Sequence, residues 1–397
     1  MTEVQNKTSL KERIAWPIVW SVATLAVISL YAIWVAAEND AKMGTPKKVV
    51  LVQAIWYLLS TVMVVIVMQF DAEQLFKIAP FIYSIGILLL IAVLFLYNKS
   101  VFADTGAKSW FQLGPLTFQP SEVMKPAFIL MEARVIRQHN IKYGHSVKTD
   151  WLLIGKILAW LAPVAVLLKL QNDFGTMLVF FAIVGGMILV SGISWKIILP
   201  IYGLVIFLGV GTIVILVMTS WGQEVLGHWF HAYQFDRINS WLNPSGDTSK
   251  SAYQLWQSMK AVGSGRIFGR GFGRISVYVP VRTSDMIFSV IAETFGFVGS
   301  VALILIYTYL IFQMVKITFE TRNDFYSYLS TGVIMMILFH VFENIGMGID
   351  LLPLTGIPLP FVSQGGSALI GNMIGVGLVL SMKYHHRDYI FSTAGDF

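Results

Sequence analysis

The sequence has 397 residues, of which 56% are hydrophobic and only 13% are charged, whereas soluble globular domains are about one quarter charged. Such an apolar composition excludes a soluble protein. The 28 basic and 22 acidic residues give a net charge of +6, but they are too dispersed for a nucleic-acid-binding surface. The absence of cysteine excludes disulfides, thiolate metal sites and cysteine nucleophiles. We therefore predict a single all-α polytopic membrane domain over residues 1–397.

Apolar runs of about 20 residues, the length that crosses the hydrocarbon core of a bilayer, predict the transmembrane helices. Two of the runs, the fourth and the last, carry polar side chains and therefore need protein neighbours rather than lipid. In chain order, the ten predicted spans are 17–37, 49–69, 76–97, 121–136, 151–170, 176–192, 197–219, 286–316, 327–349 and 367–382.

The distribution of basic residues predicts the orientation in the cytoplasmic membrane, because cytoplasmic loops are enriched in Lys and Arg. With the N-terminus inside, the cytoplasmic segments hold 13 Lys and Arg residues and the short outer segments hold five. Both termini are therefore expected in the cytoplasm, and the long loop of about residues 220–285 on the outer side.

The long loop is rich in aromatic residues and glycine. Within it, KSAYQLWQSMKAV places Tyr253, Trp256 and Met259 at helical spacing, which predicts an amphipathic helix lying flat at the membrane surface. Five aromatic residues of the loop are interpreted as anchors at the interface between lipid and water. They are Trp221, Trp229, Phe230, Tyr233 and Trp241.

A glycine-rich stretch in the same loop, GSGRIFGRGFG, carries Arg266 and Arg270, and Arg274 follows it directly. Backbone amides and arginines of this kind can cradle phosphate groups. The stretch does not lie between a strand and a helix, however, so it is only a weak indication of phosphate binding.

Ionisable residues at membrane depth are costly and therefore suggest function. Glu122 and Lys125 are three residues apart at the start of the fourth span, so they lie on one helix face and can pair. A structural ion pair and a functional pair are equally compatible with this spacing.

Two aspartates stand where outer loops meet spans. Asp173 is explained more simply as the N-cap of the sixth span than as a functional group. Asp285 could also be an N-cap, aided by Ser284, but Arg282 precedes it and Glu293 follows eight residues later on nearly the same face. Asp285 is therefore the stronger functional candidate.

The segment 350–372, DLLPLTGIPLPFVSQGGSALIGN, is apolar but contains three prolines that prevent a continuous helix. Non-helical chain at this depth must be buried in protein or line a cavity. The pair Gly365 and Gly366 would let the backbone approach a ligand closely, or would serve only tight packing of the last span.

The histidines give no convincing metal site, since His228 and His231 lack a third ligand. The sequence contains no catalytic-triad arrangement, Walker loop or dinucleotide-binding fingerprint. Any chemistry must therefore rest on carboxylates assisted by cations.

Four motifs, in this order, resemble the SEDS family (shape, elongation, division, sporulation), and the ten-span layout resembles it along almost the whole chain. The sequences NDFGTM and VPVRTSDMIF resemble the RodA (elongation) branch of Gram-positive bacteria more than the FtsW (division) branch. The motifs are GAKSWFQLGPLTFQPSEVMK (106–125), QNDFGTMLVF (171–180), VPVRTSDMIFSVIAETFGFVG (279–299) and LLPLTGIPLPFVSQGGS (351–367).

The resemblance implies a peptidoglycan glycosyltransferase that polymerises lipid II at the outer membrane face for cell-wall elongation and cell shape. It also implies a class B penicillin-binding protein as partner, together with other membrane proteins of the elongation machinery. The family's essential loop carboxylate falls on Asp285, its outer-loop tryptophan on Trp110, and its acid–base pair on Glu122 and Lys125. The sequence departs from the family in reading QNDFGT for QPDLGT and SQGGS for SYGGS, which puts only fine binding contacts in doubt.

In this interpretation Asp285 is the catalytic base of an inverting transfer. The candidates to stabilise the leaving pyrophosphate are Lys125 first, and then arginines 270, 274 and 282. A divalent cation, Mg²⁺ or Mn²⁺, could share that task, and no nucleotide is needed because the donor is already activated. The competing hypotheses are a lipid II flippase, a scaffold that recruits a synthase, and an FtsW-like division or sporulation paralogue. The predicted substrate-binding residues are Lys108, Trp110, Glu122, Lys125, Asp173, Arg282, Ser284, Ser363, Gln364, Gly365, Gly366 and Ser367.

Overall fold

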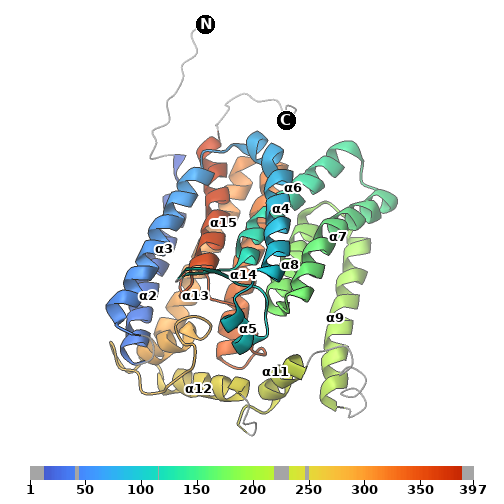
Figure 1. Ribbon diagram of the computed structural model, residues 1–397. Coiled ribbons are helices and arrows are strands. Elements are labelled where there is room, and N and C mark those ends of the chain that lie inside the picture. The colour runs from blue at the N-terminus through green and yellow to red at the C-terminus, as the bar shows by residue number, and fades with distance from the viewer. Residues whose placement is uncertain (1–12, 41–43, 115, 219–231, 246–249, 387–397) are drawn as a thin grey trace, which may run out of the picture.

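The computed structural model describes residues 13–40, 44–114, 116–218, 232–245 and 250–386, and most of them are helical (Figure 1). In chain order the helices are α2 (Trp16–Glu38), α3 (Pro46–Val67), α4 (Ala72–Phe95), α5 (Lys99–Thr105), α6 (Pro120–Lys142), α7 (Val147–Leu170), α8 (Phe174–Val190), α9 (Trp195–Met218), α11 (Ala232–Leu242), α12 (Lys250–Ser264), α13 (Ile287–Thr321), α14 (Asp324–Gly348) and α15 (Gly366–His385). A short antiparallel hairpin, β1 (Phe111–Leu113) and β2 (Leu116–Phe118), pairs Phe111 with Phe118.

Within the described residues, eight helices are long and apolar enough to cross a membrane, namely α2, α3, α4, α7, α9, α13, α14 and α15. Helix α8 is apolar but has only 17 residues. Helix α6 is long but carries the polar residues that weakened the fourth predicted span. All ten predicted spans coincide with helices, and the prediction of a polytopic helical membrane protein is confirmed.

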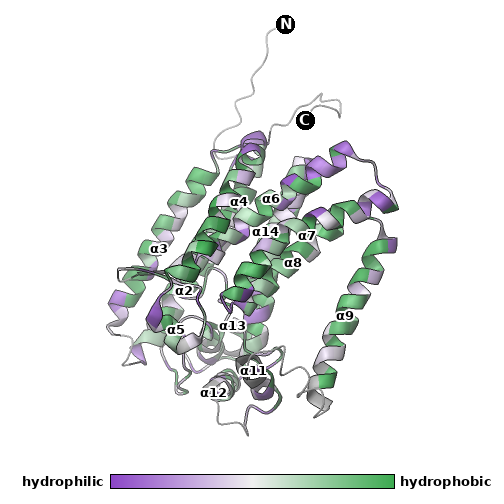
Figure 2. Ribbon diagram, turned by 45° about the vertical axis from the view of Figure 1, so that its right-hand side comes forward, coloured by the Kyte–Doolittle hydropathy of each residue, from purple (hydrophilic) through white to green (hydrophobic). Residues whose placement is uncertain are grey.

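The bundle has buried helices at its centre and exposed apolar side chains on its outer surface. Helices α6, α14 and α15 are buried along most of their length, whereas α9 stands at the edge of the bundle with Val205 and Phe207 largely exposed (Figure 1). Hydrophilic residues gather toward the two ends of the helices (Figure 2). This pattern is the one expected when lipid surrounds the middle of the bundle.

Local sequence signals fix several helix ends. Asp71 accepts a hydrogen bond from the backbone of Gln74, and the Gln74 side chain accepts one in return, so α4 begins with a capping box. Ser146 and Thr149 form the same arrangement at the start of α7. These caps satisfy backbone amides that the first helical turn leaves without partners.

Helices α11 and α12 lie across the end of the bundle at which α13 begins (Figure 1). In α12, Ala252 and Leu255 are buried against the bundle while Tyr253 and Trp256 are exposed. A helix with one buried and one exposed face is therefore present at residues 250–264, and its place at the membrane surface stays a prediction. Trp221, Trp229 and Phe230 lie outside the described residues.

Helix α13 is broken at Gly296, whose backbone angles (φ 67°, ψ −158°) are accessible essentially only to glycine. The glycine-rich stretch docks into this break through backbone hydrogen bonds. They run from Arg270 N to Glu293 O (3.0 Å), Gly271 N to Thr294 O (3.2 Å), Phe297 N to Arg266 O (2.9 Å) and Val298 N to Ile267 O (3.1 Å).

The close approach of this stretch to the α13 backbone explains two of its glycines. A Cβ atom on Gly265 would overlap the carbonyl of Ala292, and one on Gly269 would overlap the carbonyl of Thr294. Gly265 and Gly269 are thus explained by backbone packing against α13, without a phosphate ligand.

Candidate functional site

Asp285 lies in the loop before α13 and is only partly buried. The turn that holds it is formed by Val281, whose carbonyl accepts hydrogen bonds from the amides of Ser284 (3.2 Å) and Met286 (3.4 Å). Val281 has a φ of 54°, an unusual conformation for a β-branched residue. The sequence around Asp285 therefore forms a tight turn at the membrane boundary rather than a simple helix cap.

The surroundings of Asp285 change its acidity. Burial raises the pKa of its carboxyl from 3.8 to about 6, although a hydrogen bond from Ser284 and the charge of Arg237 act in the opposite direction. A carboxylate with a pKa near 6 is ionised at neutral pH yet basic enough to accept a proton from a reacting hydroxyl.

The proline-rich segment lies directly beside Asp285. No helix is present in residues 349–365, as the prolines predict. Gly356 in this segment adopts φ 80°, and a Cβ atom there would be 3.4 Å from Oδ2 of Asp285. The backbone of this segment thus forms one wall next to the carboxylate.

Hydrogen bonds fix the Asp285 loop to the proline-rich segment and to α14. Three successive carbonyls of the loop each accept one of them. Gln364 N donates to Thr283 O (2.8 Å), Ser363 Oγ to Ser284 O (2.6 Å), and Asn344 Nδ2 to Asp285 O (2.7 Å).

The wall is supported from two further helices. Arg237 of α11 donates from Nη1 to the carbonyl of Thr355 at 2.8 Å. Gly175, at the start of α8, lies against the same carbonyl, since a Cβ atom there would be 3.2 Å from Thr355 O. The second and fourth sequence motifs therefore meet beside Asp285.

Asp173 acts as the N-cap of α8, as predicted, and also links three helices. Its Oδ1 accepts from the amide of Thr176 (3.2 Å), and its Oδ2 accepts from Nε2 of Gln119 (2.8 Å). The amide of Gln119 donates to the hydroxyl of Ser367 at 3.0 Å. Asp173 and Ser367 thus join the starts of α6, α8 and α15.

The glycine pair before α15 has two different environments. A Cβ atom on Gly366 would overlap the ring of Trp56 in α3, so this glycine permits tight packing. A Cβ atom on Gly365 would meet no atom within 4 Å among the described residues.

Glu122 and Lys125 form a buried ion pair on α6, as their spacing predicts. Lys125 Nζ lies 2.9 Å from Oε1 and 2.8 Å from Oε2 of Glu122, and the two residues are 1% and 3% exposed. The ammonium group also lies 2.8 Å from Nε2 of His340 in α14. Gly371 brings α15 against the backbone of Glu122.

Helix α14 connects this ion pair to the Asp285 loop. His340 contacts Lys125, and Asn344, one turn later, donates to Asp285 O and at 2.8 Å to Ile357 O. Glu343 lies between them in sequence, buried, with its side chain facing the hydroxyl of Thr355.

The predicted site residues did not include His340, Glu343 and Asn344, although the sequence carries a signal for them. The stretch HVFEN places three polar side chains at positions i, i+3 and i+4 within an apolar span. Polar residues on one face of a membrane helix point to the bundle interior.

Lys108 and Trp110 lie in the hairpin region before α6. The Lys108 ammonium group is over the rings of Tyr97 (5.4 Å) and Phe102 (5.6 Å), and the Trp110 carbonyl accepts from Asn98 N at 2.7 Å. Among the interactions of the described residues, no hydrogen bond or ion pair joins either residue to Asp285 or to Glu122.

Arg282 is 2% exposed and lies three residues before Asp285. Its guanidinium carbon is 5.8 Å from the ring centroid of Tyr278, burial lowers its pKa, and Nε and Nη2 donate no hydrogen bond within the described residues. Arg270, by contrast, has Nε 3.5 Å from the buried carboxylate of Glu293. Arg282 therefore has two buried nitrogens without a hydrogen-bond partner in the described residues, whereas the charge of Arg270 is balanced by Glu293.

Glu293 holds the loop between α12 and α13. Its Oε1 accepts hydrogen bonds from the amides of Ser276 (2.7 Å) and Val277 (3.3 Å) and from the Ser276 hydroxyl (3.2 Å). Glu293, which was predicted to share a face with Asp285, thus binds the backbone of this loop instead.

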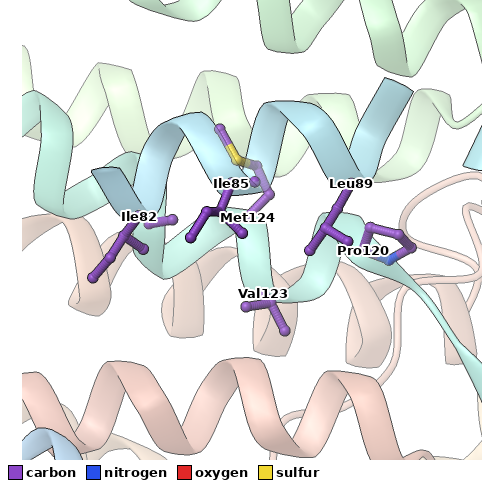
Figure 3. A pocket seen from close by; sticks show the side chains of 8 residues that line it. Ile82, Ile85, Leu89, Pro120, Val123 and Met124 are labelled. Atoms are coloured by element: carbon purple, nitrogen blue, oxygen red, sulfur yellow. The ribbon is translucent and has the colours of Figure 1, made fainter. Parts of the chain in front are cut away.

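An apolar cavity of about 80 Å³ lies between α4 and α6 (Figure 3). The cavity is lined by Ile82, Ile85, Gly86, Leu89, Pro120, Val123, Met124 and Ala127.

In the described part of the chain, no group of three or more His, Cys, Asp or Glu side chains could hold a metal ion.

Comparisons with known proteins agree with this arrangement. The sequence matches the FtsW/RodA/SpoVE family, described as cell cycle proteins, over residues 13–388. It is 32% identical to the peptidoglycan glycosyltransferase MrdB of Escherichia coli K12, over 98% of each chain. It is 28% identical to a probable peptidoglycan glycosyltransferase FtsW of Hydrogenovibrio crunogenus, covering 96% of this chain and 95% of that one.

The fold is also similar to a solved chain of a peptidoglycan synthase complex. The TM-score is 0.75 at 25% identity, and the match covers 95% of this chain and 99% of the other. With the motifs meeting around one loop and relatives matched along nearly the whole length, the chain belongs to the FtsW/RodA/SpoVE family of cell cycle proteins.

Proposed function

We propose that this protein is a peptidoglycan glycosyltransferase that polymerises lipid II at the outer face of the cytoplasmic membrane. The observation that carries the proposal is Asp285, a partly exposed carboxylate held by its backbone between the proline-rich segment and α14, with a pKa of about 6. The similarity to peptidoglycan glycosyltransferases along nearly the whole chain supports the same activity.

Asp285 acts as the general base in a single displacement. It takes the proton from the 4-hydroxyl of the acceptor sugar, whose oxygen attacks C1 of the donor. The bond from C1 to the lipid pyrophosphate breaks, and undecaprenyl diphosphate leaves. An inverting transfer of this kind needs one base, and not the two close carboxylates of a retaining site.

Cationic side chains stabilise the charge that develops on the leaving pyrophosphate. Arg282 is suited to this role because two of its guanidinium nitrogens donate no hydrogen bond within the described residues. Lys125 is largely neutralised by Glu122, so its part is to keep the polar interior of the bundle in place near the site. Fixed donors in a site with little water stabilise developing charge strongly.

Within the described residues, no cluster of three or more ligating side chains could hold a divalent cation without further ligands. Mg²⁺ or Mn²⁺ would instead need oxygens of the substrate pyrophosphate among its ligands. The displacement with Asp285 as base uses only groups of the protein and of the substrate.

We also propose a membrane topology and a cellular role for the protein. Helices α6 and α8 complete ten spans, both termini lie in the cytoplasm, and α11 and α12 cover the outer end. For the cellular role we propose cell-wall elongation, on the basis of the sequences NDFGTM and VPVRTSDMIF. A class B penicillin-binding protein is the expected partner, since a similar chain was solved within a peptidoglycan synthase complex.

Purified protein with lipid II in detergent provides the test, because a detergent micelle has no second compartment. We expect glycan polymer from the wild type and none from Asp285→Asn, with Asp71→Asn, an exposed cap at the start of α4, as the matched control. Folded wild-type protein that makes no polymer would exclude the transferase and favour the flippase or the scaffold. Polymer from Asp285→Asn would remove Asp285 from the mechanism.

A further inference from the structure

Four consecutive carbonyls of the proline-rich segment, those of residues 360–363, are held by side chains from three other helices. Tyr307 OH of α13 donates to Pro360 O (2.5 Å), Tyr57 OH of α3 to Phe361 O, Ser29 Oγ of α2 to Val362 O (2.7 Å), and Gln53 Nε2 of α3 to Ser363 O (3.4 Å).

Gln53 contacts the segment on both sides of Gln364. While its amide nitrogen donates to Ser363 O, its Oε1 accepts from the amide of Gly365 at 3.3 Å. Gln53 is only 1% exposed, so no water competes for these contacts. Its side chain thus pairs with the backbone as a neighbouring strand would.

The same segment carries the Asp285 loop. Ser363 Oγ accepts from Leu359 N (2.8 Å) and donates to Ser284 O, and Gln364 N donates to Thr283 O. A continuous set of hydrogen bonds therefore runs from α2, α3 and α13 through residues 360–364 to the two residues before Asp285.

We propose that Ser29, Gln53, Tyr57 and Tyr307 are positioning residues that fix the Asp285 carboxylate through the backbone of residues 360–364. This inference rests on the proposed function. Buried carbonyls in non-helical chain need donors in any case. If satisfying those carbonyls were the whole role of the four side chains, their loss would lower stability and leave turnover by the folded protein unchanged.

A positioning role predicts a different result. Without one donor the segment shifts, and the Asp285 loop shifts with it, while the predicted substrate-binding residues Lys108 and Trp110 of the hairpin region stay in place. A misplacement of about 1 Å at a reacting group can cost on the order of 100-fold in rate. Turnover should therefore fall while KM for lipid II stays nearly constant.

The test compares variants that remove one hydroxyl and keep the shape. Tyr57→Phe and Ser29→Ala delete donors to residues 361 and 362. Tyr83→Phe and Ser21→Ala are matched controls, because Tyr83 OH donates to Trp160 O (2.6 Å) and Ser21 Oγ to Pro17 O (2.8 Å), both remote from the segment. Kinetics on lipid II and thermal midpoints in detergent are measured for all four.

We expect kcat to fall about tenfold in each test variant and further in the double variant, with KM and the thermal midpoint close to those of the controls. Equal kcat in test and control variants would overturn the positioning role while leaving the proposed function intact. Absence of polymer from the wild type would instead contradict the proposed function itself.

A second measurement covers variants that purify poorly. Amide hydrogen exchange of residues 281–286 reports the order of the Asp285 loop without any activity. We expect faster exchange in Tyr57→Phe or Tyr307→Phe than in Tyr83→Phe. Unchanged exchange in both test variants would contradict the inference.

Discussion

At the scale of single residues, the pKa of Asp285 gives the clearest prediction. As a general base the carboxylate must be ionised, and burial raises its pKa to about 6. We expect kcat/KM for lipid II to rise as the pH increases through about 6 and then to level off. Rates measured across this pH range test the assignment, and a profile that is flat down to pH values near 4 would contradict it.

The same shift predicts the effect of Asp285 on stability. The unfolded chain ionises near 3.8 and the folded protein near 6, so the stability that the neutral carboxyl contributes is complete below 3.8 and lost as the pH rises through about 6. Asp285→Asn stays neutral throughout. Its melting temperature should exceed that of the wild type at about pH 8, and this gap should close at about pH 4. A gap of the same size at both pH values would show that the carboxyl does not titrate in this way.

The Glu122 and Lys125 pair should respond strongly to single changes. Removing one partner leaves an uncompensated charge in a buried site, which costs about 3–5 kcal/mol. We expect Lys125→Ala and Glu122→Ala each to lower both the thermal midpoint and polymerisation. Exchanging the two charges should restore stability more than turnover, since the position of the ammonium next to His340 is lost. Full activity in both single variants would mean that the pair is dispensable.

Individual site residues were predictable to different degrees. The i, i+3 spacing of Glu122 and Lys125 determines their contact, and the cap role of Asp173 follows from local turn chemistry. The contact of Asn344 with Asp285 joins residues 59 positions apart. Local spacing carries no information on such a pairing, so only the tertiary structure reveals it.

At the scale of elements, the break in α13 can be tested through its glycine. Gly296→Ala cannot adopt the observed backbone conformation without strain and would place a Cβ against the backbone of Ile267 and Gly269. We expect a lower thermal midpoint and faster proteolysis within residues 265–277. Gly209→Ala in α9 is the control, because a Cβ there meets no described atom within 4 Å. An unchanged midpoint in Gly296→Ala would argue against the docking of the loop.

Hydropathy predicted the helices because lipid demands long apolar runs. It also marked residues 121–136 and 367–382 as spans that need protein neighbours, and α6 and α15 are indeed buried in the bundle. The break at Gly296 was not predictable in this way, since the apolar run continues on both sides of it apart from Glu293 and Thr294. The glycine-rich stretch suggested a phosphate ligand. Its partner in the structure is the α13 backbone, and a contact with backbone atoms cannot be recognised from the sequence of the stretch.

At the scale of the whole molecule, the absence of cysteine makes the topology directly measurable. Thr117 and Lys148 are both exposed, in the hairpin before α6 and at the start of α7. With both termini inside, a cysteine at position 117 should react with an impermeant maleimide in intact cells. One at position 148 should react only after the membrane is opened. The reverse pattern would invert the proposed orientation and place Asp285 on the cytoplasmic side.

The four held carbonyls also have a consequence for biogenesis. A helix can enter lipid alone because it satisfies its own backbone, whereas each open carbonyl in hydrocarbon costs several kcal/mol. The donors to residues 360–363 come from α2, α3 and α13. Residues 360–363 can therefore leave water only after those three helices have met, which makes their burial a late step that follows release of the earlier helices from the insertion machinery.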